Sequence, residues 1–188
     1  MTDQTNGKGK PPAGAAQKPA GQGAGQGAGQ GTGQGTGQGQ AGIQAQVIGQ
    51  YIKDLSFENP NVGKLLGPQG ENPNIQVAVN VDARKVGDDV YESAINFKAT
   101  AANKEMTFYD LEVVYAGLFR LQNIPEQALE PFLLINCPTL VFPFLRRLIA
   151  DLTREGGFPP LLMDPIDFAQ LYMRRQQELA AAQAAAKS

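Results

Sequence analysis

The chain has 188 residues, of which 18 are acidic, 16 are basic and none is histidine, giving a net charge of −2. Without histidine, the usual Ser–His and Cys–His catalytic pairs and most transition-metal sites are excluded, so we predict neither an enzyme nor a cofactor or metal. The single cysteine, Cys137, excludes an internal disulfide and fits a reducing compartment as a buried structural residue.

Residues 1–42 differ in composition from the rest of the chain. They hold 14 of the 22 glycines and repeat Gly-Gln-Gly-Ala and then Gly-Gln-Gly-Thr from Gly21 to Thr36. With almost no apolar side chains to bury, they cannot offset the backbone entropy of ordering, about 1–2 kcal/mol per residue. We therefore expect a disordered tail, which is either an inert solvated extension or an adhesive one.

The tail carries three Lys and one Asp, which leaves 13 basic and 17 acidic side chains, a net charge of −4, on residues 43–188. An acidic body argues against a nucleic-acid partner. We find no apolar run that approaches the ~20 residues needed to span a bilayer. The N-terminus also lacks the apolar core of a signal peptide. The sequence thus predicts a cytoplasmic location without direct membrane insertion.

Four segments show the alternation of β-strands. The first, residues 45–58, is expected to direct its odd-numbered apolar residues to one face: Val47, Tyr51, Leu55 and Phe57. The even-numbered residues from 48 to 58 then face the other way. A Gly-, Pro- and Asn-rich crossover loop over 59–74 precedes three further predicted strands, at about 75–81, 90–100 and 106–118. Short connections at 82–88 and 103–104 make these three an antiparallel meander.

Helices follow the strands. A short helix is predicted over 126–135, and a long amphipathic helix then runs from about 136 until Gly156-Gly157 ends it. Its apolar stripe has helical spacing: Val141, Leu145, Leu148 and Leu152, widened by Phe142 and Ile149. The last helix is predicted to begin at Pro165 with Asp164 as its cap. Beyond Arg175 the Ala-rich end has nothing to bury and is expected to fray.

Strands followed by helices predict an α+β fold, a four-stranded antiparallel Greek-key-like sheet with the long helix and the C-terminal helix on one face. The segment from Pro131 to Leu145 is more apolar than one copy of such a domain can cover. We therefore expect both self-association and an exposed apolar patch.

Four carboxylates are predicted to converge on the open sheet surface, Asp54 and Glu58 from the first strand and Asp110 and Glu112 from the fourth. An acid/base pair would need a cleft that desolvates one member, which an open sheet does not supply. A divalent-cation site has no accompanying Asp/Gly loop pattern. The remaining interpretations are a solvated polar face and an acidic docking patch for a basic partner.

The segment CPTLVFPFLRRLIADLTREGGFPPLLMDPIDFAQLY, Cys137 to Tyr172, resembles the C-terminal half of the SecB family of bacterial export chaperones. Two further segments, GDDVYES at Gly87 to Ser93 and YIKDLSFENPN at Tyr51 to Asn61, match the family in the same order. The resemblance spans about residues 44 to 176. It implies a chaperone domain over 43–176, between the disordered tail over 1–42 and a flexible Ala-rich tail over 177–188.

The resemblance implies an ATP-independent holdase that keeps unfolded precursor proteins translocation-competent and delivers them to the SecA motor ATPase. It also implies a homotetramer built as a dimer of dimers. By position, Asp54, Glu58 and Glu112 match acids of the family that contact SecA, and Asp110 lies among them where well-known members have an apolar residue. The residues expected to line the client groove are Ile75, Val77, Val79, Phe142, Leu145, Leu162, Phe168 and Leu171.

Two alternatives remain beside this prediction. A chaperone of the same fold could serve another system, such as restraint of a toxin. A small enzyme with a carboxylate or metal-assisted site is the alternative of a different class, which a turnover screen with divalent metals would reveal.

Overall fold

The computed structural model describes residues 42–66 and 71–186, all within one compact unit that extends from Gly39 to Ser188. The expected N-terminal tail lies outside the described residues, apart from Gly42. The strands are β1 (Gln44–Glu58), β2 (Asn74–Gly87), β3 (Val90–Ala102) and β4 (Thr107–Gln122). The helices are η1 (Val62–Leu66, 3-10), α1 (Glu126–Pro131), η2 (Phe132–Asn136, π), α2 (Cys137–Glu155) and α3 (Phe168–Ala186).

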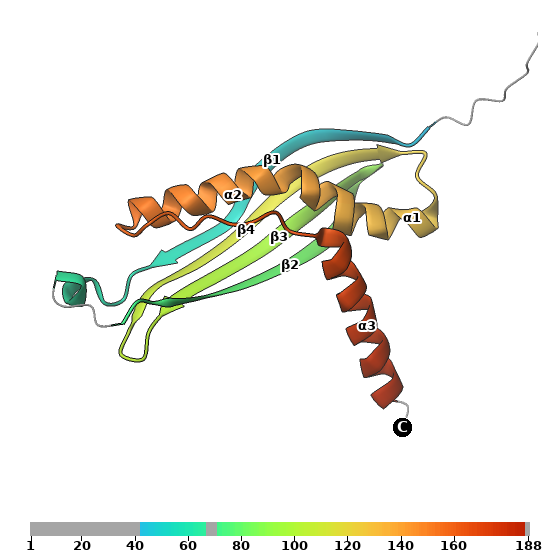
Figure 1. The fold of residues 1–188 in the computed structure, drawn as a ribbon. Helices are drawn as coiled ribbons and strands as arrows, with labels where there is room; N and C mark the ends of the chain where they lie inside the picture. The colour runs from blue at the N-terminus through green and yellow to red at the C-terminus, as the bar shows by residue number, and fades with distance from the viewer. Residues whose placement is uncertain (1–41, 67–70, 187–188) are drawn as a thin grey trace, which may run out of the picture. The chain divides into compact units, whose positions relative to one another are not determined.

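The four strands form one antiparallel sheet in the order β1-β4-β3-β2 (Figure 1). Two short turns join β2, β3 and β4, and the crossover that contains η1 brings β1 alongside β4. This confirms the predicted Greek-key-like arrangement. The strands are longer than predicted. In particular, β2 continues through the expected turn at 82–88 to Gly87, and the chain reverses at Asp88 and Asp89.

The predicted facing of β1 is wrong in part, because β1 contains two irregularities. Its pairing with β4 skips Ile48, between Val47 and Gly49, and skips Lys53, between Ile52 and Asp54. Each extra residue is a β-bulge, which shifts the alternation of the residues that follow it. Tyr51 was expected on the same face as Leu55 and Phe57 but therefore lies on the opposite face. Ile52, which is opposite Tyr115, lies on the face of Leu55 and Phe57 instead.

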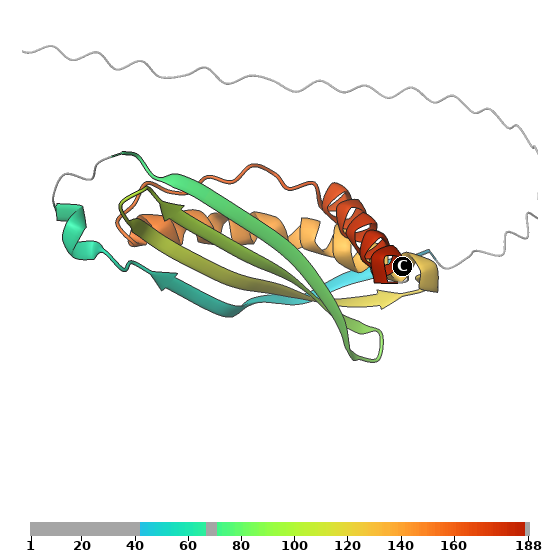
Figure 2. The same cartoon turned by 90° about the horizontal axis from the view of Figure 1, so that it is seen from below.

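Helices α1, η2 and α2 follow one another without a break, and α2 lies over one face of the sheet (Figures 1 and 2). The π turn sits directly before Pro138, which has no N–H to donate to the carbonyl of Leu134. The N–H of Cys137, the residue before the proline, donates to the carbonyl of Phe132, five residues back, as in a π turn. The separate short helix predicted over 126–135 is therefore the first part of a longer helical run.

This run, Glu126–Glu155, has 30 residues and is long and apolar enough to cross a membrane by length and composition alone. That corrects the expectation that no stretch approaches such a length. In the structure α2 packs against the sheet through one side, with Val141, Phe142, Leu145 and Ile149 buried as predicted. Leu140 and Phe144 lie outside this packed side and are 50% and 45% exposed, so α2 also leaves apolar surface uncovered.

Close approach of α2 to the sheet depends on two glycines. A Cβ placed on Gly117 of β4 would lie 2.6 Å from the ring of Phe119 and 2.9 Å from Val141 of α2. A Cβ on Gly156, at the end of α2, would lie 2.3 Å from the ring of Phe57. All three distances are too short for packed atoms, so a larger residue at either site would push the helix away from the sheet.

After α2 the chain returns in extended form over 158–167 and is tied to the helix by Thr153. The buried hydroxyl of Thr153 accepts a hydrogen bond from the N–H of Leu161 at 2.9 Å. Helix α3 begins at Phe168, three residues later than predicted, because Asp167 and not Asp164 provides the cap: its Oδ1 accepts from the N–H of Gln170 at 2.9 Å. The Ala-rich end expected to fray is helical to Ala186 in the structure, consistent with the high helix propensity of alanine.

Among the described elements, the sheet face away from α2 carries no helix, and we call it the open face. A nearly buried carboxylate lies there, Glu92 of β3, with a 3% exposed side chain. Its oxygens accept from Lys53 Nζ at 2.8 Å, from Arg84 Nε at 2.8 Å and Nη2 at 3.2 Å, and from the Tyr51 hydroxyl. We call these four residues the Glu92 cluster. It joins β1, β3 and β2 across the open face.

The Glu92 cluster makes the stability of the protein depend on pH. The hydrogen bonds from Arg84, together with those from Lys53 and Tyr51, lower the pKa of Glu92 to about 2, against the opposing effect of burial. A carboxyl with a depressed folded-state pKa stabilises the fold above its unfolded pKa, near 4.3, and loses that contribution as pH falls towards 2. We predict that Glu92→Gln lowers the free energy of unfolding at pH 7 by about 1–3 kcal/mol, since Lys53 and Arg84 are themselves 40% and 61% exposed and therefore screened.

Urea unfolding followed by circular dichroism, at one protein concentration and at several pH values, measures this difference. The gap between the wild type and Glu92→Gln should be constant above pH 5 and should shrink between pH 5 and about pH 2. A gap that does not change over that window would show that the ionised carboxylate contributes nothing to stability.

Candidate functional site

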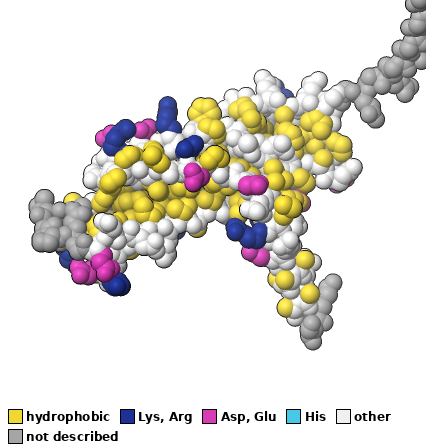
Figure 3. Space-filling model, in the orientation of Figure 1, with side chains coloured by type: hydrophobic (Ala, Val, Ile, Leu, Met, Phe, Trp, Pro, Cys, Tyr) yellow, Lys and Arg dark blue, Asp and Glu magenta, His cyan; other side chains and the backbone are white. Residues whose placement is uncertain are grey.

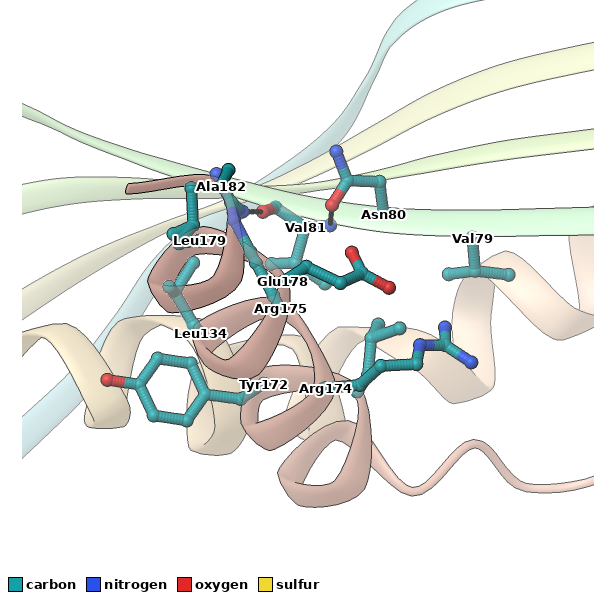
Figure 4. Close-up of a pocket in the computed structure, with 11 residues that line it drawn as sticks. Val79, Asn80, Val81, Leu134, Tyr172, Arg174, Arg175, Glu178, Leu179 and Ala182 are labelled. Carbon is teal, nitrogen blue, oxygen red and sulfur yellow. Dashed lines mark hydrogen bonds between the residues drawn. The ribbon is translucent and has the colours of Figure 1, made fainter. Parts of the chain in front are cut away.

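A groove lies between the free edge of the sheet and the C-terminal part of the chain, and we call it the α3 groove. It consists of two cavities, of about 670 Å³ and 280 Å³, that share Val79, Leu171 and Arg174. Figure 4 shows the larger cavity, where Arg174, Arg175 and Glu178 of α3 lie beside β2. The smaller cavity continues towards Val77, with Met163 and Ile166 of the extended segment as its other wall.

The α3 groove combines an apolar surface with a charged border. Apolar side chains come from β2, from η2 and from α3: Val79, Val81, Leu134, Leu171, Tyr172 and Leu179. Arg175 Nη1 donates to the carbonyl of Val81 at 2.7 Å and lies 3.8 Å from the carboxylate of Asp82, so it fixes α3 against β2 at this point. Such a surface can bind an extended apolar segment whose polar backbone faces the charged border.

The structure divides the eight residues predicted to line a groove. Val77, Val79 and Leu171 line the α3 groove, and Ile75 is exposed on the same face of β2. Leu162, on the extended segment, is 74% exposed but lines neither cavity. The other three are corrected: Phe142, Leu145 and Phe168 are buried in the core, where the rings of Phe142 and Phe168 meet edge to face with centroids 5.8 Å apart.

Sequence reasoning missed several residues of the α3 groove, including Tyr172, Arg174 and Arg175. Their positions on α3 follow from its start at Phe168 and from its tilt against β2, and the sequence did not define either. The spacing of Leu171, Arg175 and Leu179, at four-residue steps, was the one signal that these residues share a face.

The four predicted carboxylates do converge on the open face, and we call Asp54, Glu58, Asp110 and Glu112 the acidic patch. Glu58 of β1 lies directly opposite Asp110 of β4, and Ser56 lies opposite Glu112. Lys98 of β3 pairs with Glu112 at 2.5 Å, and the Thr100 hydroxyl donates to Asp110 Oδ1 at 2.6 Å. The pKa of Lys98 is raised, first by its hydrogen bond to Glu112 and also by the charges of Asp110 and Glu58.

The acidic patch is exposed to solvent and only partly neutralised. Asp54, Glu58 and Glu112 have exposed side chains, and Lys98 is the cation that pairs with the patch among the described residues. Placing like charges opposite one another on adjacent strands is unfavourable for the isolated sheet. An exposed surface with this charge is suited to contact with a basic partner rather than to acid/base chemistry.

Two observations bear on the enzyme alternative. Among the residues that the structure describes, no group of three or more His, Cys, Asp or Glu side chains is arranged to hold a metal ion. Burial raises the pKa of the Cys137 thiol to about 12, and its side chain has no exposed surface. A thiol in that state is not a nucleophile near neutral pH.

A second apolar surface lies on the helix side, away from the α3 groove. Leu140 and Phe144, one turn apart on α2, are 50% and 45% exposed. On β1, the side chains opposite Phe119, Tyr115 and Val113 are also exposed: Val47, Ile52 and Leu55. The space-filling view shows a further band of hydrophobic side chains, below α2 along the extended segment, on the side of the α3 groove (Figure 3).

Comparison with known proteins identifies the family. Residues 38–179 match the family described as "Preprotein translocase subunit SecB". The "Protein-export protein SecB" of Parvibaculum lavamentivorans is 51% identical over 142 residues, 76% of this chain and 84% of that protein. The protein of the same description from Methylocella silvestris is 52% identical over 132 residues, 70% of this chain and 82% of that protein.

A solved structure shares the fold. It is a SecB-like chaperone of Mycobacterium tuberculosis in complex with a peptide from the HigA1 antitoxin, with a TM-score of 0.54 and 13% identity over 65% of this chain and 90% of that one. At that identity the likeness concerns the fold alone. The family match and the two relatives cover most of the chain, and on their strength the chain belongs to the SecB family of protein-export chaperones.

Proposed function

We propose that this chaperone is an ATP-independent holdase of the cytoplasm, which binds unfolded precursor proteins in the α3 groove and delivers them to the SecA ATPase. The observation that carries the proposal is the groove itself, an apolar channel that residues 42–66 and 71–186 leave uncovered on the surface. Each CH₂ group of a client that is buried there contributes about 0.8 kcal/mol, whatever the client's sequence. Binding of this kind suits a protein that must accept many different unfolded chains.

The edge position of β2 supports an extended client. Among the strands of the described residues β2 is the last of the sheet, so one side of its backbone N–H and C=O groups has no neighbouring strand there. Such groups can pair with an added strand. Arg175 already occupies the carbonyl of Val81, so the free length of the edge lies towards Val77 and Ile75. Backbone pairing there would add affinity without requiring a particular client sequence.

We propose that the second apolar surface is an interface between copies of this chain, in a homotetramer built as a dimer of dimers. This surface has exposed apolar residues on two elements, β1 and α2, and each element could supply one of the two kinds of subunit contact that such an assembly requires. Several grooves on one assembly would let a long client bind at more than one of them, and avidity would then raise the overall affinity.

We propose that SecA docks on the acidic patch. The patch is exposed, carries four carboxylates against one paired lysine, and lies on the opposite face of the sheet from α2. Contact with a basic surface of SecA would act mainly on the association rate and would weaken with salt. The identity of about 50% to protein-export proteins favours this role over restraint of a toxin.

For the groove, we predict that Val77→Asp reduces client affinity about tenfold or more, because an unpaired carboxylate must be desolvated when an apolar segment binds. The matched control is Val86→Asp, since both valines lie on β2 and are 42% and 45% exposed, and Val86 lines neither cavity. Suppression of aggregation of a refolding client measures the effect. Equal activity of the two variants would place client binding elsewhere.

For the acidic patch, we predict that Glu112→Lys weakens SecA binding about tenfold at low salt and leaves suppression of aggregation unchanged. Glu155→Lys is the control, because it makes the same change of net charge at an exposed position at the end of α2. Titration calorimetry at two salt concentrations measures the affinity. Loss of both activities together would mean that the open face is not a separate docking site.

For the assembly, we predict that Phe144→Asp reduces the molar mass measured by light scattering from that of a tetramer to that of a dimer or monomer. A charge in a dry apolar interface costs several kcal/mol, which is enough to dissociate it. Val86→Asp, at an equally exposed valine, should remain a tetramer. If the wild type itself is a monomer, the proposed assembly is wrong.

A further inference from the structure

The second β-bulge of β1 lies directly before the acidic patch. Ile52 is opposite Tyr115 and Asp54 is opposite Val114, so Lys53 is an extra residue with no partner on β4. Residues on either side of a bulge do not follow simple alternation, and here Tyr51, Lys53 and Asp54 are all directed towards the open face. The position of the extra residue therefore decides which way Asp54 points.

The Glu92 cluster holds the extra residue in place. Lys53 Nζ lies 2.8 Å from Glu92 Oε1, and the neighbouring Tyr51 hydroxyl donates to the other oxygen of the same carboxylate. Glu92 is fixed in turn, because it belongs to the inner strand β3, is 3% exposed and is bound by two of the guanidinium nitrogens of Arg84, Nε and Nη2. Two residues of the edge strand are thus tied to one carboxylate in the middle of the sheet.

Only a short part of β1 depends on this attachment. Beyond the acidic residues, Phe57 is held by the core, with its ring stacked on Tyr109 at 5.7 Å and against Phe158 at 6.4 Å. Between Lys53 and Phe57, a bulge that moved one residue along the chain would turn Asp54 towards the helix side, while Leu55 and Phe57 could keep their places. Asp54 is therefore the first acidic residue to be lost from the open face.

We propose that Lys53, anchored on Glu92, is a positioning residue for the acidic patch: it fixes the β-bulge at position 53 and so keeps Asp54 on the open face. The geometric part of the proposal concerns the fold of β1 alone. Its consequence for SecA rests on the proposed function. The two parts are tested separately, so that failure of one can be told from failure of the other.

The first test reads the direction of residue 54 from the reactivity of a thiol. Asp54→Cys introduces an exposed thiol into a chain whose own Cys137 has no exposed surface and a pKa raised to about 12, so only position 54 should react with a charged thiol reagent. Adding Lys53→Met, which keeps the length of the side chain but removes the ammonium, should slow this reaction about tenfold. The thiol would then lie among the apolar side chains of the helix side, which raise its pKa and disfavour a charged reagent.

Two controls accompany the labelling. Lys104→Met removes an equally charged residue from another surface ion pair, with Glu71 at 3.5 Å, and should leave the rate unchanged. Deletion of Lys53 removes the extra residue itself, so that regular alternation places position 54 on the open face and the thiol should react as in the parent. An unchanged rate in Lys53→Met, with circular dichroism showing a folded protein, would overturn the proposal.

The second test uses the sign of the effect on SecA affinity. Lys53→Met makes the open face more acidic, so electrostatics alone predicts tighter binding of a basic partner. The proposal predicts weaker binding, about fivefold, as expected for the loss of one charge-assisted contact. Lys104→Met, with the same change of net charge, should not weaken binding.

A double variant then shows whether Lys53 acts through Asp54. If it does, Asp54→Asn should weaken SecA binding in the parent but should add little in the Lys53→Met background. Full additivity of the two changes would overturn the positioning role. If Glu112→Lys and Asp54→Asn both leave SecA affinity unchanged, the proposed docking site fails, and the thiol labelling alone decides whether Lys53 fixes the bulge.

Discussion

The architecture depends on a mismatch of width between one helix and four strands. A helix with its side chains is about 10 Å across, whereas four strands spaced about 4.8 Å apart present a face nearly twice as wide. Helix α2 therefore buries the two inner strands, where Ile95, Phe97, Leu111 and Val113 are at most 2% exposed. The apolar residues on the same side of the edge strands remain open to solvent, including Ile52 on β1 and Val77 on β2.

The two uncovered edges differ, and the difference follows from connectivity. The extended segment and α3 return along β2, so that this edge becomes one wall of a groove. No described element returns along β1, so its apolar side chains stay uncovered together with Leu140 and Phe144 of α2. Partial cover makes a channel suited to a flexible chain, and the absence of cover makes a flat surface suited to a second folded copy. Both proposed roles of the apolar surface thus have the same physical origin.

Periodicity in the sequence predicted the elements that alternate regularly. Strand β3 places Tyr91, Ile95 and Phe97 on one face as expected, and the stripe of α2 centred on Leu145 is buried. The errors occur where one residue interrupts a period. Two bulges displaced the facing of β1, and a choice between two aspartates displaced the start of α3. Near both places there are tertiary contacts that the sequence pattern does not contain. Lys53 at the second bulge pairs with Glu92 of another strand, and Arg175 holds α3 against β2.

The four carboxylates of the acidic patch nevertheless lie on one face as expected, although β1 does not alternate regularly along its whole length. Asp54 and Glu58 were assigned to the face opposite Leu55 and Phe57, which is right, but Tyr51 was assigned to the side of the apolar pair, which is wrong. The extra residue Lys53 lies between these two groups, so the prediction is correct after it and inverted between the two bulges, from Gly49 to Ile52. Strict alternation would place Tyr51 and Asp54 on opposite faces, and an inserted residue is needed for both to reach the open face. The buried carboxylate of Glu92, which binds both Tyr51 and Lys53, is the feature that fixes where the insertion falls.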